Sequence, residues 1–215
     1  FEYANGFGCN TCGFNYVTRY TDGRGGQILS EYDDRGNLVS RRDRIASVVD
    51  TYEYNAFGQQ IAHTLPDNGS GHRRRDVYTY YTDGPQRGYR EAKIVDAGGL
   101  ELTTRLEYDR LGRVVKRFDG KGADTQLVYN ALDEVIQEFS REVTPGSGIR
   151  YEKRFHYDAN GNVTRQDIEN VDEDGHRVAA NPYFTTTMEY EILDKVVRVT
   201  QEVSPEHNVV TEYGY

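Results

Sequence analysis

The chain is short of the residues that build compact cores, metal clusters and membrane spans. It has no tryptophan, 1 methionine, 2 cysteines and 5 prolines among 215 residues, and hydrophobic residues make up only 36%. This apolar share would supply a two-layer core poorly, whereas a single sheet with water on much of one face needs less. No stretch approaches the length of a membrane span. Because residue 1 is phenylalanine, we expect a fragment or processed product, so a missing signal peptide carries no information.

Positive charge is also scarce. Lysine and arginine number 26 against 35 aspartates and glutamates, which gives a net charge of −9 and a pI near 5.1. This balance argues against a nucleic-acid partner bound through a general basic face. The one basic cluster, residues 72–75, adjoins a loop rich in proline, glycine and asparagine and is predicted to be part of a solvated loop.

The two cysteines, Cys9 and Cys12, stand in a C-x-x-C spacing. A zinc or iron–sulfur site usually needs four ligands, and no second pair exists. A thioredoxin-like redox pair needs a βαβ context that this region lacks. The pair is therefore predicted to be unremarkable or to form a disulfide; half of a metal site completed by sequence outside the chain is the alternative.

Tyrosine and glycine, by contrast, are abundant, at 18 and 22 residues, which is not the composition of a disordered chain. They recur in a fixed order, most clearly in Tyr157-Asp158-Ala159-Asn160-Gly161-Asn162-Val163. An aromatic residue ends one strand, aspartate opens a turn, glycine closes it and an apolar residue starts the return strand, as at the end of a β-hairpin. We call this segment a tip, number its positions from the tyrosine and name each copy after that tyrosine.

Six tips recur, with a degenerate copy around Tyr80. The second residue can accept backbone N–H bonds from residues further along the turn. The fifth needs a left-handed backbone, which glycine adopts freely and aspartate tolerates. The tyrosine rings are expected to stack between hairpins, with the hydroxyl near water or a polar partner. The predicted structural positions are Tyr32, Asp33, Gly36, Tyr54, Asn55, Gly58, Tyr108, Asp109, Gly112, Tyr129, Asn130, Asp133, Tyr157, Asp158, Gly161, Tyr190, Glu191 and Asp194.

Between the tips lie further turn signals, such as those at residues 22–25, 96–99 and 119–122, so each repeat reads as strand, turn, strand, turn. Side chains with a period of two in segments 101–108 and 151–157 predict strands with one drier face. In segment 151–157 the residues that share this face are Tyr151, Lys153, Phe155 and Tyr157. Helical spacing is absent over any long window. The sequence therefore predicts an all-β fold of tandem antiparallel hairpins, joined edge to edge into a curved or spiralling sheet.

The tips resemble the YD repeats of Rhs proteins, wall-associated polymorphic toxins, insecticidal toxin-complex shell subunits and teneurins. The resemblance covers residues 20–215 as one repeat array, with residues 1–19 as a lead-in. It implies a hollow shell that, in bacterial members, encloses a C-terminal toxin domain. The closing Asp-Pro-x-Gly-like motif and autoproteolytic aspartates of such shells have no match, since the late prolines, Pro182 and Pro205, follow Asn181 and Ser204. We therefore expect a mid-shell segment without self-cleavage.

The resemblance implies a noncatalytic wall without cofactor, which pairs through its strand edges with the rest of the same shell or with other copies. An enclosed toxin domain is the implied cargo, and the implied location is secreted or at the cell surface. No metal site is assigned. Asn170, Asp172 and Asp174 match the first half of a calcium loop, but residue 181 is asparagine where glutamate is needed, so an acidic turn is favoured over calcium.

Two other classes of function remain as alternatives. The first is an extracellular adhesin or filament that binds glycans or neighbouring cells, for which the surplus tyrosines Tyr78, Tyr80, Tyr81 and Tyr89 are the candidates, although tryptophan is absent. The second is an enzyme such as a glycosidase, which would need two carboxylates ~5–10 Å apart in a cleft. The five histidines are scattered without metal-ligand spacing and are expected at the surface or in loops.

Overall fold

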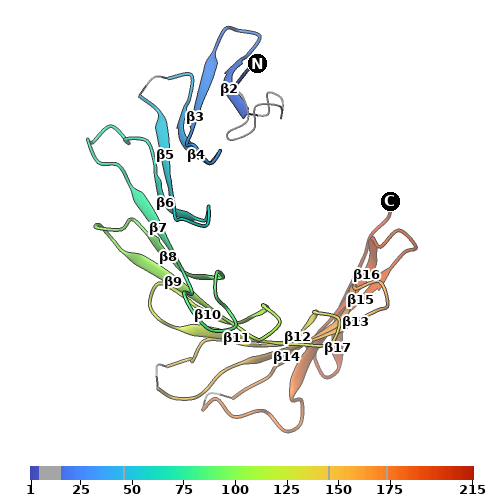
Figure 1. Cartoon of the computed structure of the whole chain (residues 1–215). Helices are drawn as coiled ribbons and strands as arrows, with labels where there is room; N and C mark the ends of the chain where they lie inside the picture. The colour runs from blue at the N-terminus through green and yellow to red at the C-terminus, as the bar shows by residue number, and fades with distance from the viewer. Residues whose placement is uncertain (5–15, 46, 145, 173) are drawn as a thin grey trace. The chain divides into compact units, whose positions relative to one another are not determined.

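Strands are the only long regular elements in the described part of the chain (Figure 1). The computed structural model describes residues 1–4, 16–45, 47–144, 146–172 and 174–215. These residues form 17 strands with antiparallel pairing and no helix, which confirms the all-β prediction. No helix long and apolar enough to cross a membrane occurs among them. Cys9 and Cys12 lie outside the described residues, and their pairing stays a prediction.

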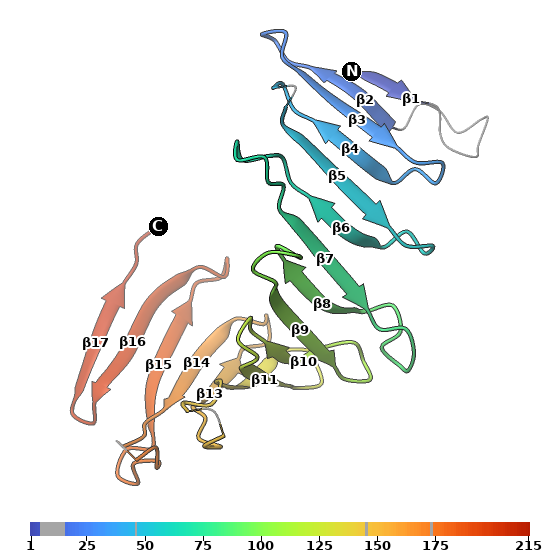
Figure 2. The same ribbon diagram turned by 90° about the vertical axis from the view of Figure 1, so that its left-hand side faces the viewer.

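The chain divides into two compact units, Phe1–Arg105 and Leu106–Tyr215. In the first unit each strand pairs with its neighbours in chain order, as Figure 2 shows. Its strands are β1 (Glu2–Ala4), β2 (Tyr16–Thr21), β3 (Gln27–Tyr32), β4 (Leu38–Arg42), β5 (Val49–Tyr54), β6 (Gln60–Thr64), β7 (Arg75–Tyr80), β8 (Arg90–Val95) and the start of β9 (Leu102–Tyr108).

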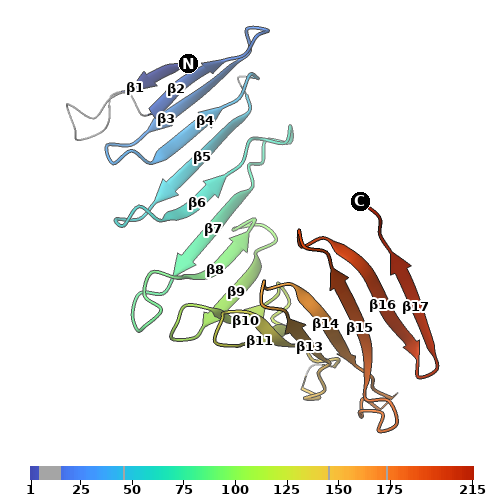
Figure 3. The same cartoon turned by 90° about the vertical axis from the view of Figure 1, so that its right-hand side faces the viewer.

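The second unit repeats this order of pairing from β10 to β17 (Figure 3). It contains the end of β9 and the strands β10 (Val114–Phe118), β11 (Asp124–Tyr129), β12 (Val135–Phe139), β13 (Glu152–Tyr157), β14 (Val163–Glu169), β15 (Tyr183–Tyr190), β16 (Val196–Ser204) and β17 (His207–Glu212).

The tips connect successive strands, and the turns between them close the opposite ends of the hairpins. In the turn that follows β2, the backbone N–H of Asp22 donates to Gly26 and that of Gly25 donates back to Asp22. The turn after β10 uses Asp119, Gly122 and Ala123 in the same way. Three further connections, at residues 65–74, 140–151 and 170–182, are longer.

Arginine side chains fasten the first two of these long connections. Arg73 donates to the backbone carbonyls of Val49 at 2.6 Å, Thr64 at 3.4 Å and Leu65 at 2.9 Å. Arg73 thus holds the start of β5 and the end of β6 together, which are the two ends of the preceding hairpin. In the basic cluster at residues 72–75, positions 72–74 lie in an exposed loop, as predicted, and β7 begins at Arg75. The cluster also forms ion pairs: Arg75 with Glu53, and Arg74 with Asp76.

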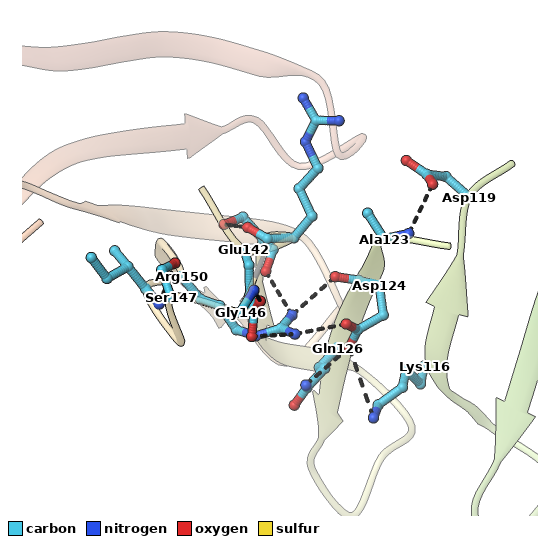
Figure 4. A network of polar contacts seen from close by, with 12 residues as sticks. Lys116, Asp119, Ala123, Asp124, Gln126, Glu142, Gly146, Ser147 and Arg150 are labelled. Carbon is cyan, nitrogen blue, oxygen red and sulfur yellow. Dashed lines mark hydrogen bonds and ion pairs between the residues drawn. The ribbon is translucent and has the colours of Figure 1, made fainter. Parts of the chain in front are cut away.

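Arg150 is the counterpart of Arg73 in the second unit. It donates to the carbonyls of Asp124 and Ser140, both at 3.0 Å, and to the Asp124 carboxylate at 2.6 Å. In Figure 4 this carboxylate lies among Arg150, Gln126 and Lys116. Arg73 and Arg150 both stand seven residues before a tyrosine that ends the next strand, Tyr80 or Tyr157.

Burial in the described residues falls on acidic side chains as well as apolar ones. The buried apolar residues are Ala62 and Ala92, whereas Asp76, Glu152 and Asp167 are buried carboxylates. On β13 Phe155 and Tyr157 are partly buried, and the most buried residue is Glu152, on the opposite face, where His156 is exposed. Each of these carboxylates pairs with an arginine two residues away along the chain, Arg74, Arg154 or Arg165, whose side chain stays partly exposed.

Glu152 is the centre of the densest of these polar clusters. Its carboxylate accepts hydrogen bonds from Arg154 at 2.7 Å, Arg177 at 3.1 Å, the Tyr183 hydroxyl at 2.9 Å and Gln137 at 2.8 Å. The guanidinium groups of Arg154 and Arg177 lie 4.6 and 5.0 Å from the centre of the Tyr183 ring. Burial alone would raise the pKa of Glu152, but the bonds from Arg154 and Tyr183 outweigh it and lower that pKa.

Replacement of Glu152 tests whether this cluster stabilises the second unit. Glu152→Ala should lower the free energy of unfolding by about 3 kcal/mol, because it leaves two guanidinium groups without their buried partner. The effect should shrink as the pH falls below about 4.3, since a carboxylate with a lowered pKa stabilises the fold only while ionised. Urea unfolding at several pH values measures both.

The matched control is Glu206→Ala, which removes an exposed carboxylate from the turn before β17 and should change stability by less than about 0.5 kcal/mol. Equal losses in the two variants would contradict the role given to Glu152.

Candidate functional site: the hairpin tips

The six tips share one backbone geometry. In tip 157 the N–H of Asp158 donates to the carbonyl of Asn162 at 3.0 Å, and the N–H of Gly161 donates to that of Asp158 at 3.2 Å. The same pair of bonds recurs in every tip. The fifth position is left-handed throughout, with φ of 84° at Gly36, 77° at Gly58, 85° at Gly112, 64° at Asp133, 86° at Gly161 and 59° at Asp194.

This combination is a three-residue hairpin loop that ends in a bulge. In the five tips for which the register is given, it shifts immediately before the tyrosine, as at Glu31/Tyr32. The bulge sets which face of the sheet the tyrosine occupies.

The side chain of the second position completes the turn. In five tips its Oδ1 atom accepts the backbone N–H groups of positions four and six, at 2.8 to 3.0 Å. These bonds lower the pKa of Asp158, led by that from the N–H of Asn162. Tip 190 is the exception: Oε1 of Glu191 is buried without a hydrogen bond in the described residues, 3.9 Å from Lys195. One extra methylene moves the carboxylate out of the turn.

The second and sixth positions are chemically matched, which sequence reasoning did not anticipate. Where the second residue is aspartate, the sixth is a donor to it, as in Asp33 with Asn37 at 2.8 Å. Asp109 with Arg113 and Asp158 with Asn162 follow the same rule. Where the second residue is asparagine, its amide donates to an acceptor at position six: Gln59 in tip 54 and Glu134 in tip 129.

Within each unit, tyrosine hydroxyls join successive hairpins. The hydroxyl of Tyr54 donates to the carbonyl of Leu38, which is the seventh position of tip 32, at 2.9 Å. The same hydroxyl bond to the seventh position of the preceding tip recurs in both units, at 2.7 to 3.0 Å. The pairs are Tyr80 to Gln60, Tyr129 to Val114, Tyr157 to Val135, Tyr190 to Val163 and Tyr215 to Val196. Tyr32 donates in the same way to Val17 at 3.1 Å.

The sequence predicts that the tyrosine rings stack between hairpins with the hydroxyl near a polar partner. In the described residues the hydroxyl bond to a carbonyl is the contact that joins successive tips. The signal for it was the use of tyrosine, and never phenylalanine, at position one of all six tips. Burial raises the pKa of the hydroxyl in Tyr54, Tyr129, Tyr157 and Tyr190.

Side chains at positions four and six also join neighbouring tips. Arg35 donates to the carbonyl of Ala56 at 3.0 Å, which links tips 32 and 54. Arg113 donates to the carbonyl of Asn130 and to the Asp133 carboxylate, which links tips 108 and 129. Tips 157 and 190 are linked by two amides, those of Asn160 and Asn162, that both donate to Asp194. Asp194 thus combines a left-handed backbone with an acceptor that glycine lacks.

Other residues that the sequence singled out lie apart from the tips or serve as ion-pair partners. Ligand atoms of Asp172, Asp174 and His176 lie within 4.8 Å of one another on an exposed turn. The amide of Asn170, the first residue of the suggested calcium loop, instead donates to the carbonyl of Asn181. His63 is not a loop residue: it lies on β6, 2.7 Å from Asp50, and stacks on Tyr52.

The carboxylates that are buried in the described residues all have cationic partners. Asp76 pairs with Arg74 and Lys93, and Asp167 pairs with Arg165. Such ion pairs favour the ionised carboxylate, whereas the general acid of a glycosidase must be kept protonated.

Comparison with known proteins identifies the repeat. Residues 32–70 match the family model described as RHS Repeat. No curated protein matches the chain. The chain therefore carries an RHS repeat, as the resemblance predicted.

The fold has similar solved structures. The crystal structure of TcdB2-TccC3-Cdc42 superposes with a TM-score of 0.60 at 17% identity, and that of TcdB2-TccC3 without hypervariable C-terminal region with 0.60 at 16%. That of TcdB2-TccC3 follows with 0.59 at 18%. In each case 86% of this chain is covered but only 10% of the matched chain, so it spans about a tenth of their length. The likeness shows that the fold is the Rhs shell fold.

The tyrosine hydroxyl bond leads to a first prediction for the tips. Tyr157→Phe should lower the free energy of unfolding by about 1 kcal/mol at neutral pH, because the carbonyl of Val135 loses its donor. A raised pKa means that folding favours the neutral hydroxyl, so its contribution is full below pH ~10 and disappears as the pH rises through the folded-state pKa. The difference between variant and wild type in urea unfolding should therefore narrow at alkaline pH.

The control is Tyr213→Phe, the same change at an exposed tyrosine, for which no loss is expected. A loss at position 157 no greater than at position 213 would contradict the linking role.

The matching of positions two and six can be tested in tip 129. Asn130→Asp should destabilise the tip by about 1 kcal/mol, because it sets a second carboxylate against Glu134. The double change Asn130→Asp with Glu134→Asn recreates the pair found in tip 157 and should recover most of that loss. A double-mutant cycle from urea unfolding gives the coupling, and a coupling near zero would show that the two positions are independent.

Proposed function

We propose that this chain, which carries an RHS repeat and has the Rhs shell fold, is a noncatalytic wall segment of a shell that encloses a toxin or effector domain. The observation that carries the proposal is the tyrosine bond from each hairpin to the carbonyl that follows the preceding tip. A chain built this way gains stability from nearest neighbours along one axis, as repeat proteins do. Such a chain extends into a surface instead of closing around a core.

The proposed mechanism is containment. Within each unit the strands are joined by backbone hydrogen bonds, and the tips and opposite turns are fastened by side chains. A sheet of this kind separates what lies on its two sides without any chemical step. The repeat array is taken to run over residues 20–215, with residues 1–19 as a lead-in.

The partners we propose are other parts of the same shell, or other copies, through strand edges, and an enclosed toxin. The matched structures are of a complex named TcdB2-TccC3, which supports assembly with further shell parts. A secreted or cell-surface location rests on the same likeness. Residues 106–215 carry 13 lysines and arginines against 21 aspartates and glutamates, which would favour a basic cargo.

The proposal predicts association through the strand edges. β17 pairs with β16 on one side, and all six of its residues are exposed. Adjacent residues of a strand direct their N–H groups to opposite edges, so proline at Val209 and at Val210 gives a matched pair. One of the two should weaken self-association and leave the fold intact, because it removes an N–H from the outer edge. The other should destabilise the β16–β17 hairpin.

Sedimentation velocity over a range of concentrations, with thermal unfolding as the control for the fold, distinguishes these outcomes. A wild-type chain that stays monomeric throughout would count against the proposal.

A further inference from the structure

The first unit has a groove between tip 54 and the degenerate copy at Tyr80. It encloses about 680 Å³, within the range of small-ligand sites. Most of its wall is aromatic or apolar, and an arginine stands at its edge. The residues that matter here are Phe57, Ile61, Tyr78, Tyr80, Tyr81 and Arg87. Three of the surplus tyrosines singled out in the sequence therefore meet at one place.

The polar groups of the groove are largely engaged by the fold itself. The amide of Asn55 donates to Gln59, whose own amide donates to the carbonyl of Gly88. The Tyr80 hydroxyl donates to the carbonyl of Gln60. A sugar needs several unengaged donors and acceptors around an aromatic platform, and this wall offers few. The groove instead suits an apolar side chain.

Arg87 adds a charge preference. Its backbone N–H donates to Gly84, while its exposed guanidinium forms no ion pair among the described residues. An apolar group that enters the groove is therefore favoured when a carboxylate accompanies it.

Tip 190 has this combination on its surface. Ile192 is 95% exposed and Leu193 is 70% exposed, and the exposed Asp194 follows them, whereas Oε1 of Glu191 is buried near Lys195. Two adjacent exposed large apolar side chains are unusual among these tips, whose third position is otherwise aspartate, alanine or arginine. A protruding apolar group rimmed by charge is typical of a protein contact.

We propose that tip 190 of one copy inserts Ile192 and Leu193 into the groove of a second copy, with Asp194 facing Arg87. Charge supports this pairing only locally: Arg87 lines the groove, and the exposed Asp194 stands at the tip. The groove and the tip lie in different units and are different surfaces. The contact is therefore heterologous, which joins copies head to tail.

The test uses two surface variants of the whole chain. A groove variant, Phe57→Glu with Arg87→Glu, repels the acidic tip, and a tip variant, Ile192→Ser with Leu193→Ser, removes the apolar insert. All four side chains are exposed, so circular dichroism should show an unchanged fold. Each variant alone should associate at least about tenfold more weakly than wild type in sedimentation velocity.

Mixing the two variants gives the decisive result. One copy then still has a working groove and the other a working tip, so the mixture should regain part of the association that each variant alone has lost. Association through strand edges would be the same in all samples, which separates failure of this contact from failure of the proposed wall. Leu132→Ser, at the fourth position of tip 129 and 79% exposed, is the control and should behave as wild type.

A photo-crosslinker in place of Phe57 identifies the occupant. With one copy labelled by ¹⁵N, cross-links should join Phe57's position to residues 190–195 of the other isotope. Cross-links within one copy, cross-links only to other segments, or binding of the groove to a glycan array would each overturn the proposal.

Discussion

A hydrogen bond from a tyrosine hydroxyl to a backbone carbonyl couples successive hairpins within each unit. The ring ends one strand, and its hydroxyl reaches the residue that begins the return strand of the hairpin before it. The bond exists only if the bulge at the tip has placed the tyrosine on the correct face, and the bulge exists only if position five is left-handed. Turn chemistry, register and the coupling of neighbours are thus parts of one device.

Because this coupling is local, the chain has little need of an apolar core. The described residues bury alanines and carboxylates, and arginines two residues away on the same strand pair with Glu152 and Asp167. Longer connections are accommodated in the same way: where the tight aspartate–glycine turn is lost, Arg73 or Arg150 holds the ends of the hairpin. This use of charge accounts for a stable sheet in a chain with so low an apolar content.

Departures from the pattern coincide with the features that the repeat leaves unexplained. The degenerate copy at Tyr80 leaves an aromatic groove, and tip 190 replaces the capping aspartate with Glu191 and exposes Ile192. Regular copies make similar contacts along the sheet, so irregular ones are where contacts outside it can arise. The proposed docking of tip 190 into the groove at Tyr80 follows from the exposed apolar side chains of the tip and the apolar wall of the groove.

The sequence by itself determined the strands, the tips and the turns opposite them, because these depend on local backbone preferences: an acceptor at position two and a left-handed residue at position five. Asp133 and Asp194 could be placed there for the same reason. Only the tertiary structure decided which partners the side chains have. The bonds of Tyr157 to Val135, of Tyr183 to Glu152 and of Arg150 to Ser140 all join residues at least ten positions apart. Which strands meet, and in what register, depends on the length of every connection between them, which a pattern of residue types does not measure.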